Sequence, residues 1–198
     1  MEKGRKTKAV AIVALIVAVL GLTVAFAALS TTLTINGTAQ VNTATWDIHF
    51  ESLSSAVTTG DASELTPPTI GVGEESKPNT HIGDFEIQLT KPGDSVTYTF
   101  DVKNNGTIDA TLGTLTLGTP QCTSIAEPTV ENDATIVCDN LKFELTYTDG
   151  GTPVAQNDTL NKGETKNLTL KVSFDGDELP TDDVSIDGLD VTMIYNQK

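Results

Sequence analysis

The amino-acid sequence predicts an all-β protein, an antiparallel β-sandwich of the immunoglobulin-like or jelly-roll type preceded by an N-terminal hydrophobic export helix. Three observations lead to this prediction. Apolar and polar residues alternate along most of the chain after Leu29, as they do in half-buried strands. Clusters of glycine, asparagine, aspartate and proline separate these runs, as antiparallel turns do. A basic start followed by a long uncharged apolar run is typical of an export helix.

The start of the chain has the composition of a leader that directs export. Residues 1–8 carry four basic residues and one acid, and residues 9–29 carry no charge. Ala25 and Ala27 fit an A-x-A cleavage site, which would leave Ala28 as the first residue. We favour this signal peptide over an N-terminal membrane anchor. The anchor is the alternative because 21 apolar residues, rising about 1.5 Å each, just cross a hydrocarbon core of about 30 Å.

Both interpretations place residues 30–198 at the cell surface or outside the cell, touching the membrane only through the N-terminal segment. A third interpretation, processing after Gly4 as in type IV pilins, is disfavoured because charged residues follow Gly4. We expect residues 30–198 to form a single sandwich domain, since this length suits one hydrophobic core.

The strands are predicted, in order, by runs of alternating apolar residues. These runs lie at residues 31–39, 46–50, 85–89, 96–103, 141–147, 168–174 and 184–195. Another strand is expected to end near Leu117, and no helical spacing is found after Leu29. The last run changes parity at Gly188, which predicts a β-bulge there or, alternatively, two short strands joined by a turn.

Two longer patterns concern the organisation of the domain. Residues 54–83 contain several prolines and glycines and only scattered apolar residues, which predicts a long surface excursion. We favour a plain flexible insertion there over a binding loop.

Residues 91–106 and 162–176 resemble each other, each with a lysine-led glycine turn, an acid and an alternating strand. This similarity indicates related strands within one sandwich.

The chain is strongly acidic. It has 12 Lys and Arg against 27 Asp and Glu, a formal charge of −15, which argues against nucleic-acid binding through phosphate contacts. Removal of residues 1–27 leaves 8 lysines against 26 acidic residues, a net charge of −18. Such a surface repels copies of itself and suits a secreted or wall-associated protein that meets divalent cations.

The two cysteines predict a disulfide. Export places Cys122 and Cys138 in an oxidising compartment, with two free thiols as the alternative. By loop entropy, a bridge across so short a loop contributes ~3 kcal/mol to stability, so we expect its role to be structural.

Carboxylates crowd the last quarter of the chain, and Ca²⁺ prefers such ligands. They give a weak calcium candidate, Asp175, Asp177, Glu178, Asp182 and Asp183. The spacing is not that of an EF-hand, and we favour a solvated acidic loop. No other cofactor is expected.

The sequence contains no catalytic motif, and we predict that the protein is not an enzyme. A zinc hydrolase needs about three protein ligands, but the chain has only two histidines, His49 and His81, and no HExxH. We interpret both histidines as surface residues. A GxSxG elbow, a Walker loop and a dinucleotide fingerprint are also absent from the sequence.

Three features together resemble one known family. They are the exported leader, the strand directly after it (TTLTINGTA, residues 31–39) and the segment KPGDSVTYTFDVKNNGTIDA (residues 91–110). In this combination the chain resembles the TasA/camelysin family of Gram-positive surface and biofilm-matrix proteins. The resemblance implies a jelly-roll-like sandwich, a leader cut by a dedicated signal peptidase, and a fibre-forming or matrix role. Because camelysin-like proteins have been classed as metalloproteases, it also offers that activity, which the shortage of zinc ligands argues against.

We therefore expect a non-catalytic structural protein of the cell surface or extracellular matrix that associates with itself and with cell wall or matrix. Cleavage would free residues 28–39, here called the arm, in which Thr31, Leu33 and Ile35 lie on one face of an extended strand. The arm can then act as a donor strand for an open sheet edge of the next copy. Alternatively, it pairs within its own sandwich. The alternative function is a monomeric adhesin that binds through residues 54–83.

Overall fold

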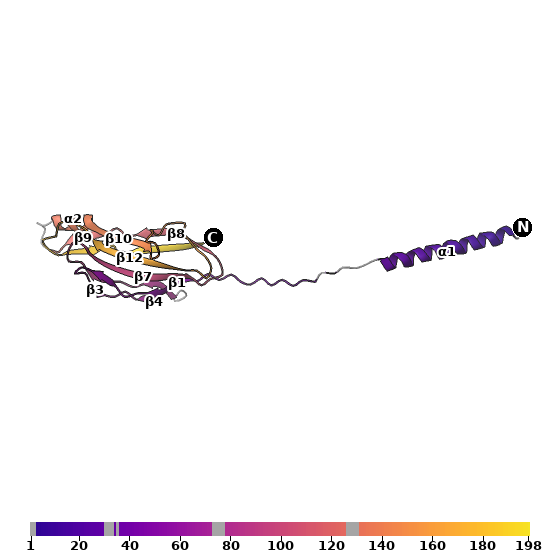
Figure 1. Ribbon diagram of the computed structural model, residues 1–198, viewed down its shortest axis with the longest axis horizontal. Helices are drawn as coiled ribbons and strands as arrows, with labels where there is room; N and C mark the ends of the chain where they lie inside the picture. Colours follow the sequence, from indigo (N-terminus) through magenta and orange to yellow (C-terminus); the bar gives the residue numbers. More distant parts are fainter. Residues whose placement is uncertain (1–2, 30–33, 35, 73–77, 126–130) are drawn as a thin grey trace. The chain divides into compact units, whose positions relative to one another are not determined.

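A computed structural model of the chain describes residues 3–29, 34, 36–72, 78–125 and 131–198. The chain divides into two compact units, Met1–Asn42 and Thr43–Lys198. The second unit is built mainly of antiparallel strands (Figure 1), and a helix occupies the start of the chain. The predicted all-β class and the N-terminal helix are therefore confirmed.

The first unit begins with helix α1 (Lys3–Leu29), which covers the predicted leader. The described residues that follow it, Thr34 and residues 36–47, belong to no strand, and Val41 is 96% exposed. The strand predicted at residues 31–39 is thus not formed where that segment is described. Within the described residues, no helix is long and apolar enough to cross a lipid bilayer.

One layer of the sandwich is a five-stranded antiparallel sheet. Its strands are β1 (Ile48–Leu53), β2 (Val57–Thr59), β7 (Asp94–Asn104), β10 (Leu141–Tyr147) and β12 (Thr165–Phe174). The order is β1-β7-β12-β10, and β2 follows β1 along the same edge of β7. The two segments of similar sequence form β7 and β12, which pair along their length from Asp94–Phe174 to Lys103–Thr165. Strands related in sequence are therefore neighbours in the sheet.

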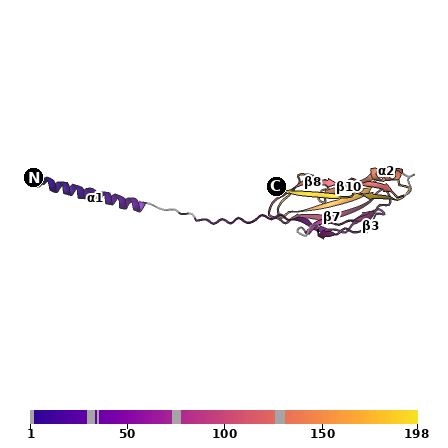
Figure 2. The same cartoon turned by 180° about the vertical axis from the view of Figure 1, so that it is seen from behind.

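The opposite layer contains a three-stranded sheet. Its central strand, β8 (Ala110–Leu117), pairs with β11 (Thr159–Leu160) on one side and with β14 (Val191–Gln197) on the other. A separate pair, β9 (Gln121–Ser124) and β13 (Val184–Asp187), adjoins it through short turns. β14 is the yellow strand that ends at the C-terminus, seen from both sides in Figures 1 and 2.

Two sequence predictions for this half of the chain are wrong. Helix α2 (Glu131–Asn140) packs on β9, although no helical spacing is evident there. Its ten residues contain too few apolar side chains to define a helical period. The parity change at Gly188 is not a bulge, because β13 and β14 are separate strands in different sheets, as the alternative prediction had it. Gly188 has φ +80° and packs against the carbonyl of Thr119, a turn that favours glycine.

The predicted surface excursion is mostly built into strands where the structure describes it. Besides β2, it contains β3 (Ser63–Thr66), β4 (Ile70–Val72) and β5 (Pro78–Ile82), of which β4 pairs with β5 and β3 pairs with β6 (Glu86–Gln88). Ala62 is buried against Val96 and Tyr98 of β7. The described residues of the excursion thus include paired strands, which the prediction of a plain insertion did not contain. Strands this short contain too few residues to show a recognisable alternation of apolar and polar side chains.

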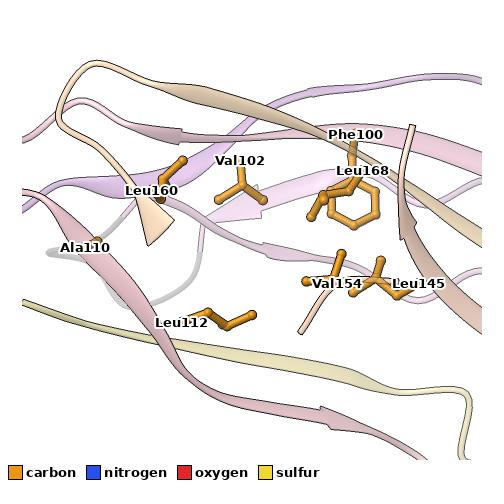
Figure 3. Packing of buried hydrophobic residues seen from close by; sticks show 8 residues of the cluster. All are labelled: Phe100, Val102, Ala110, Leu112, Leu145, Val154, Leu160 and Leu168. Atoms are coloured by element: carbon orange, nitrogen blue, oxygen red, sulfur yellow. The ribbon is translucent and has the colours of Figure 1, made fainter. Parts of the chain in front are cut away.

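The main core lies between the two layers. Eight buried apolar side chains form it: Phe100, Val102, Ala110, Leu112, Leu145, Val154, Leu160 and Leu168. Figure 3 shows Leu112 of β8 facing Val102 and Leu168 of the five-stranded sheet. Burial of a side chain of this size stabilises the fold by about 1.5–3 kcal/mol. The alternation that predicted the strands therefore also predicted which face meets the core.

Candidate functional site

A groove with a volume of about 770 Å³ runs along one side of the sandwich. Its floor is apolar and largely aromatic, with Phe50 from β1, Tyr98 and Phe100 from β7, and Leu170 from β12. The rings of Phe50 and Phe100 meet edge to face, with centroids 5.6 Å apart. These are inward-facing residues of the five-stranded sheet, so the groove opens directly onto the core.

The two walls of the groove come from distant parts of the sequence. One wall consists of Pro68 and residues 80–85, at the end of the excursion. The other consists of residues 186–193, which include the end of β13, the turn at Gly188 and the start of β14. Asp84, Asp187 and Asp190 are exposed where they border the groove. The groove therefore combines an apolar floor with an acidic rim.

β14 forms an open edge beside this groove. It is the last strand of its sheet and, among the described residues, pairs only with β8. Val191, Met193 and Tyr195 face the core and are half-buried, whereas Ile194 on the other face is 50% exposed. An edge strand of this kind presents unpaired N–H and C=O groups, which can pair with another extended segment.

Tyr98 lines the groove and carries a buried hydroxyl group. The residue is 2% exposed, and neither its hydroxyl nor Oε1 of Glu64 has a hydrogen-bond partner among the described residues. Burial, and then the nearby Glu64 carboxylate, raises the pKa of Tyr98.

The buried carboxylate of Asp94 ties the excursion to the central strand. It accepts hydrogen bonds from the backbone N–H groups of Asp61 (2.8 Å), Thr90 (2.7 Å) and Lys91 (3.0 Å). Burial alone would raise the pKa of Asp94, but these three donors and the charge of Lys91 lower it below its ordinary value. The KPGD part of the resemblance segment thus has a structural role, which the sequence did not indicate.

The predicted disulfide is confirmed. Cys122 of β9 is bonded to Cys138 of α2, with their Cα atoms 5.8 Å apart. The stretch between them was expected to be irregular, but its last part is helical. The bond therefore fastens α2 onto the β9-β13 pair.

Among the predicted calcium ligands, Asp175 has its carboxylate in an ion pair, whereas Asp182 and Asp183 form hydrogen bonds through their backbone groups. Asp175 forms an ion pair with Lys142 at 2.7 Å, and the hydrogen bond from Lys142 lowers the pKa of Asp175. The backbone N–H of Asp182 donates to Asp133, and the carbonyl of Asp183 accepts from Ile125. In the described part of the chain, which includes Asp177 and Glu178, no three His, Cys, Asp or Glu side chains could hold a metal ion together.

The two histidines lie in different parts of the second unit. His49 Nδ1 is 2.8 Å from Asp47 Oδ1, and Asp47 also accepts a hydrogen bond from Asn105. Together with the backbone bond from Asn105 N–H to the Asp47 carbonyl, this cluster fixes the start of β1 against the end of β7. His81 lies on β5 and borders the groove.

The residues predicted for processing and assembly lie at the N-terminus. Ala25, Ala27 and Ala28 are in the last two turns of α1, and the donor-strand residues Thr31, Leu33 and Ile35 are outside the described residues. Comparisons with protein-family models and with curated protein sequences find no match. What the chain does is therefore inferred from the groove, the open edge of β14 and the arm.

Proposed function

We propose that this protein is an exported, non-catalytic structural protein of the cell surface or extracellular matrix that assembles with copies of itself. The observation that carries the proposal is the open edge of β14 beside a groove with an aromatic floor. An uncovered edge strand is an aggregation hazard in a monomer, so a regular occupant is expected.

The arm of a second copy is the occupant that fits this site. Added to β14 as a further strand, the arm would satisfy the open edge with backbone hydrogen bonds. Leu33 and Ile35 are two positions apart in sequence, so in a strand both point to the same face. That face can enter the groove above Phe50 and Phe100 while the threonines between and beside them face out.

The absence of charge makes the arm a better occupant of the groove than other segments of the chain. No charged side chain occurs between Lys8 and Asp47, whereas the whole chain carries −15. Insertion of the arm would therefore bring no carboxylate to the acidic rim formed by Asp84, Asp187 and Asp190. Cleavage of the leader before Ala28 would also give the arm a free N-terminus, consistent with the resemblance to matrix proteins with a processed leader.

The experiment changes one face of the arm at a time. Leu33→Glu with Ile35→Glu should abolish assembly of the exported chain, because two carboxylates would have to enter the apolar groove. Thr32→Glu with Thr34→Glu adds the same charge to the outward face and should assemble nearly as well as the unmodified chain. Electron microscopy and sedimentation read out both variants. Equal assembly of the two variants would refute insertion of the arm, and no assembly of the unmodified chain would refute self-association.

A second candidate function is that of a monomeric adhesin. One observation supports it, namely that the predicted binding loop contributes residues to the groove. Pro68 and the end of β5, both in the predicted binding loop, supply part of a groove wall, so the groove could hold an extended segment of another protein. An adhesin would stay monomeric at high concentration and would lose binding, but not folding, when residues 68–82 are shortened. A protease of the camelysin type would instead show activity that chelators remove, which we expect to be absent from purified protein.

A further inference from the structure

We propose that the disulfide between Cys122 and Cys138 prepares the groove for assembly. It braces the end wall of the groove, defined here as residues 186–189, so that self-association requires oxidation of the two thiols outside the cytoplasm. This inference rests on the proposed function, because it concerns the regulation of the same groove.

The end wall is positioned by its pairing with β9. In the β9-β13 pair, Ile186 lies opposite Cys122 and Asp187 lies opposite Gln121, and both wall residues border the groove. Only four residue pairs join the two strands, and β13 pairs with no other strand in the described residues. A two-stranded sheet of this size is marginal by itself in water. The position of the end wall therefore depends on contacts that other elements make with β9 and β13.

Helix α2 holds both strands of that pair. The disulfide attaches α2 to β9 at Cys122, directly opposite a wall residue. The carboxylate of Asp133, which is 2% exposed, attaches α2 to the segment that leads into β13. It accepts hydrogen bonds from Thr181 N–H (3.0 Å), the Thr181 hydroxyl (2.8 Å) and Asp182 N–H (2.9 Å). β13, β9, the disulfide, α2 and Asp133 thus form a closed chain of contacts behind the wall.

Oxidation of the two cysteines adds the covalent link between α2 and β9 to these contacts. In a reducing cytoplasm both cysteines are thiols, and only hydrogen bonds and packing hold α2 to β9. Outside, one thiolate attacks the disulfide of an oxidising protein, and the second thiolate displaces that protein from the mixed disulfide. The Sγ–Sγ bond of the protein forms and the disulfide of the oxidant breaks, and the two thiols pass two electrons and two protons to the oxidant, which becomes a dithiol. A chain awaiting export would therefore present a loosened wall and would not capture arms inside the cell.

The test compares the oxidised exported chain with three variants. Cys122→Ser with Cys138→Ser removes the bond, Asp133→Ala removes the second brace with the disulfide intact, and Asp139→Asn changes an exposed residue of α2 as the control. Hydrogen exchange detected by mass spectrometry measures the exchange rates of backbone amides. Residues 181–190 report on the stability of the end wall, and β7 reports on the stability of the core. Sedimentation at matched concentration reports assembly.

The expected result is at least a tenfold increase in exchange rate across residues 181–190 in the cysteine variant, unchanged protection of β7, and loss of assembly. Asp133→Ala should show the same changes in milder form, and it decides the question if the cysteine variant unfolds as a whole. Undiminished assembly of the cysteine variant or of the chemically reduced chain would overturn this inference alone, as would unchanged exchange in the wall. Failure of the oxidised chain to assemble would instead overturn the proposed function, and with it the role of the disulfide in assembly.

Discussion

Replacing Asp94 tests whether one buried carboxylate holds the excursion onto the sandwich. Asp94 is completely buried, and its two oxygens accept three backbone N–H groups from Asp61, Thr90 and Lys91. Asp94→Ala leaves all three donors without this acceptor. Asp94→Asn keeps the shape of the side chain but loses the negative charge and one accepting position.

The expected loss follows from the number and type of these hydrogen bonds. A hydrogen bond to a charged group contributes roughly 1.5–3 kcal/mol, and such contributions are not additive within one cluster. We therefore expect Asp94→Ala to lower the free energy of unfolding by about 3 kcal/mol, and Asp94→Asn by about half as much. For a domain of this size, 3 kcal/mol corresponds to a decrease in Tm of roughly 6–12 °C.

The effect should also depend on pH with a defined sign. The folded-state pKa of Asp94 is lowered, so its contribution is fully present above the unfolded-state value of about 3.9. That contribution is lost as the pH falls through the folded-state pKa. The difference in stability between the unmodified chain and Asp94→Ala should therefore be constant near neutral pH and shrink in strong acid.

Urea unfolding followed by far-ultraviolet circular dichroism measures these differences. Asp149→Asn, the same change of charge on an exposed turn, is the matched control and should alter stability by less than about 0.5 kcal/mol. If Asp94→Ala is as stable as this control, the three hydrogen bonds do not hold the excursion in place. Loss of stability with equal magnitude at all pH values would show that the charge of Asp94 is not involved.

Three other predictions concern packing and charge. Leu168→Ala, at a fully buried core position, should cost about 3 kcal/mol in urea unfolding, and a cost below 1 kcal/mol would contradict the described core. Asn104→Ala should cost about 2 kcal/mol, because the buried amide donates to the carbonyls of Ile108 (2.9 Å) and Leu160 (3.1 Å); a neutral result would mean that water replaces it. Salt or Ca²⁺ should promote assembly, since screening weakens the repulsion between acidic copies, whose net charge is −15 for the full chain and would be −18 (8 lysines against 26 acids) after cleavage before Ala28. Light scattering that stays flat over these conditions would argue against this.

Sequence periodicity predicted the long strands because their side chains face the core on one side and solvent on the other. Residues 96–103 alternate without interruption and lie within β7, and residues 141–147 match β10 to the residue. The disulfide was also predictable, because the prediction needed only two cysteines and the expectation that the chain is exported. In each case the information lies within a short stretch of sequence or in composition.

The groove and its surroundings were not predictable in the same way. Its walls come from residues 80–85 and residues 186–193, which only the tertiary fold brings together. The three donors to Asp94 include Asp61, which is 33 residues away in sequence. Helix α2 and the strands of the excursion are too short for a period to emerge from their few apolar residues. These features depend on long-range contacts, which one sequence does not encode as a local pattern.

The way β1 lies along β7 determines how the domain would respond to tension on its N-terminus. Thr45 is fixed to Thr107 by two hydrogen bonds, and β1 then runs antiparallel to β7, the longest of the described strands. A pull on the preceding segment along the strand axis would load the β1-β7 hydrogen bonds together, in shear, instead of breaking them one at a time. A subunit held by its N-terminal segment would therefore resist stretching at the place where that segment joins the sandwich.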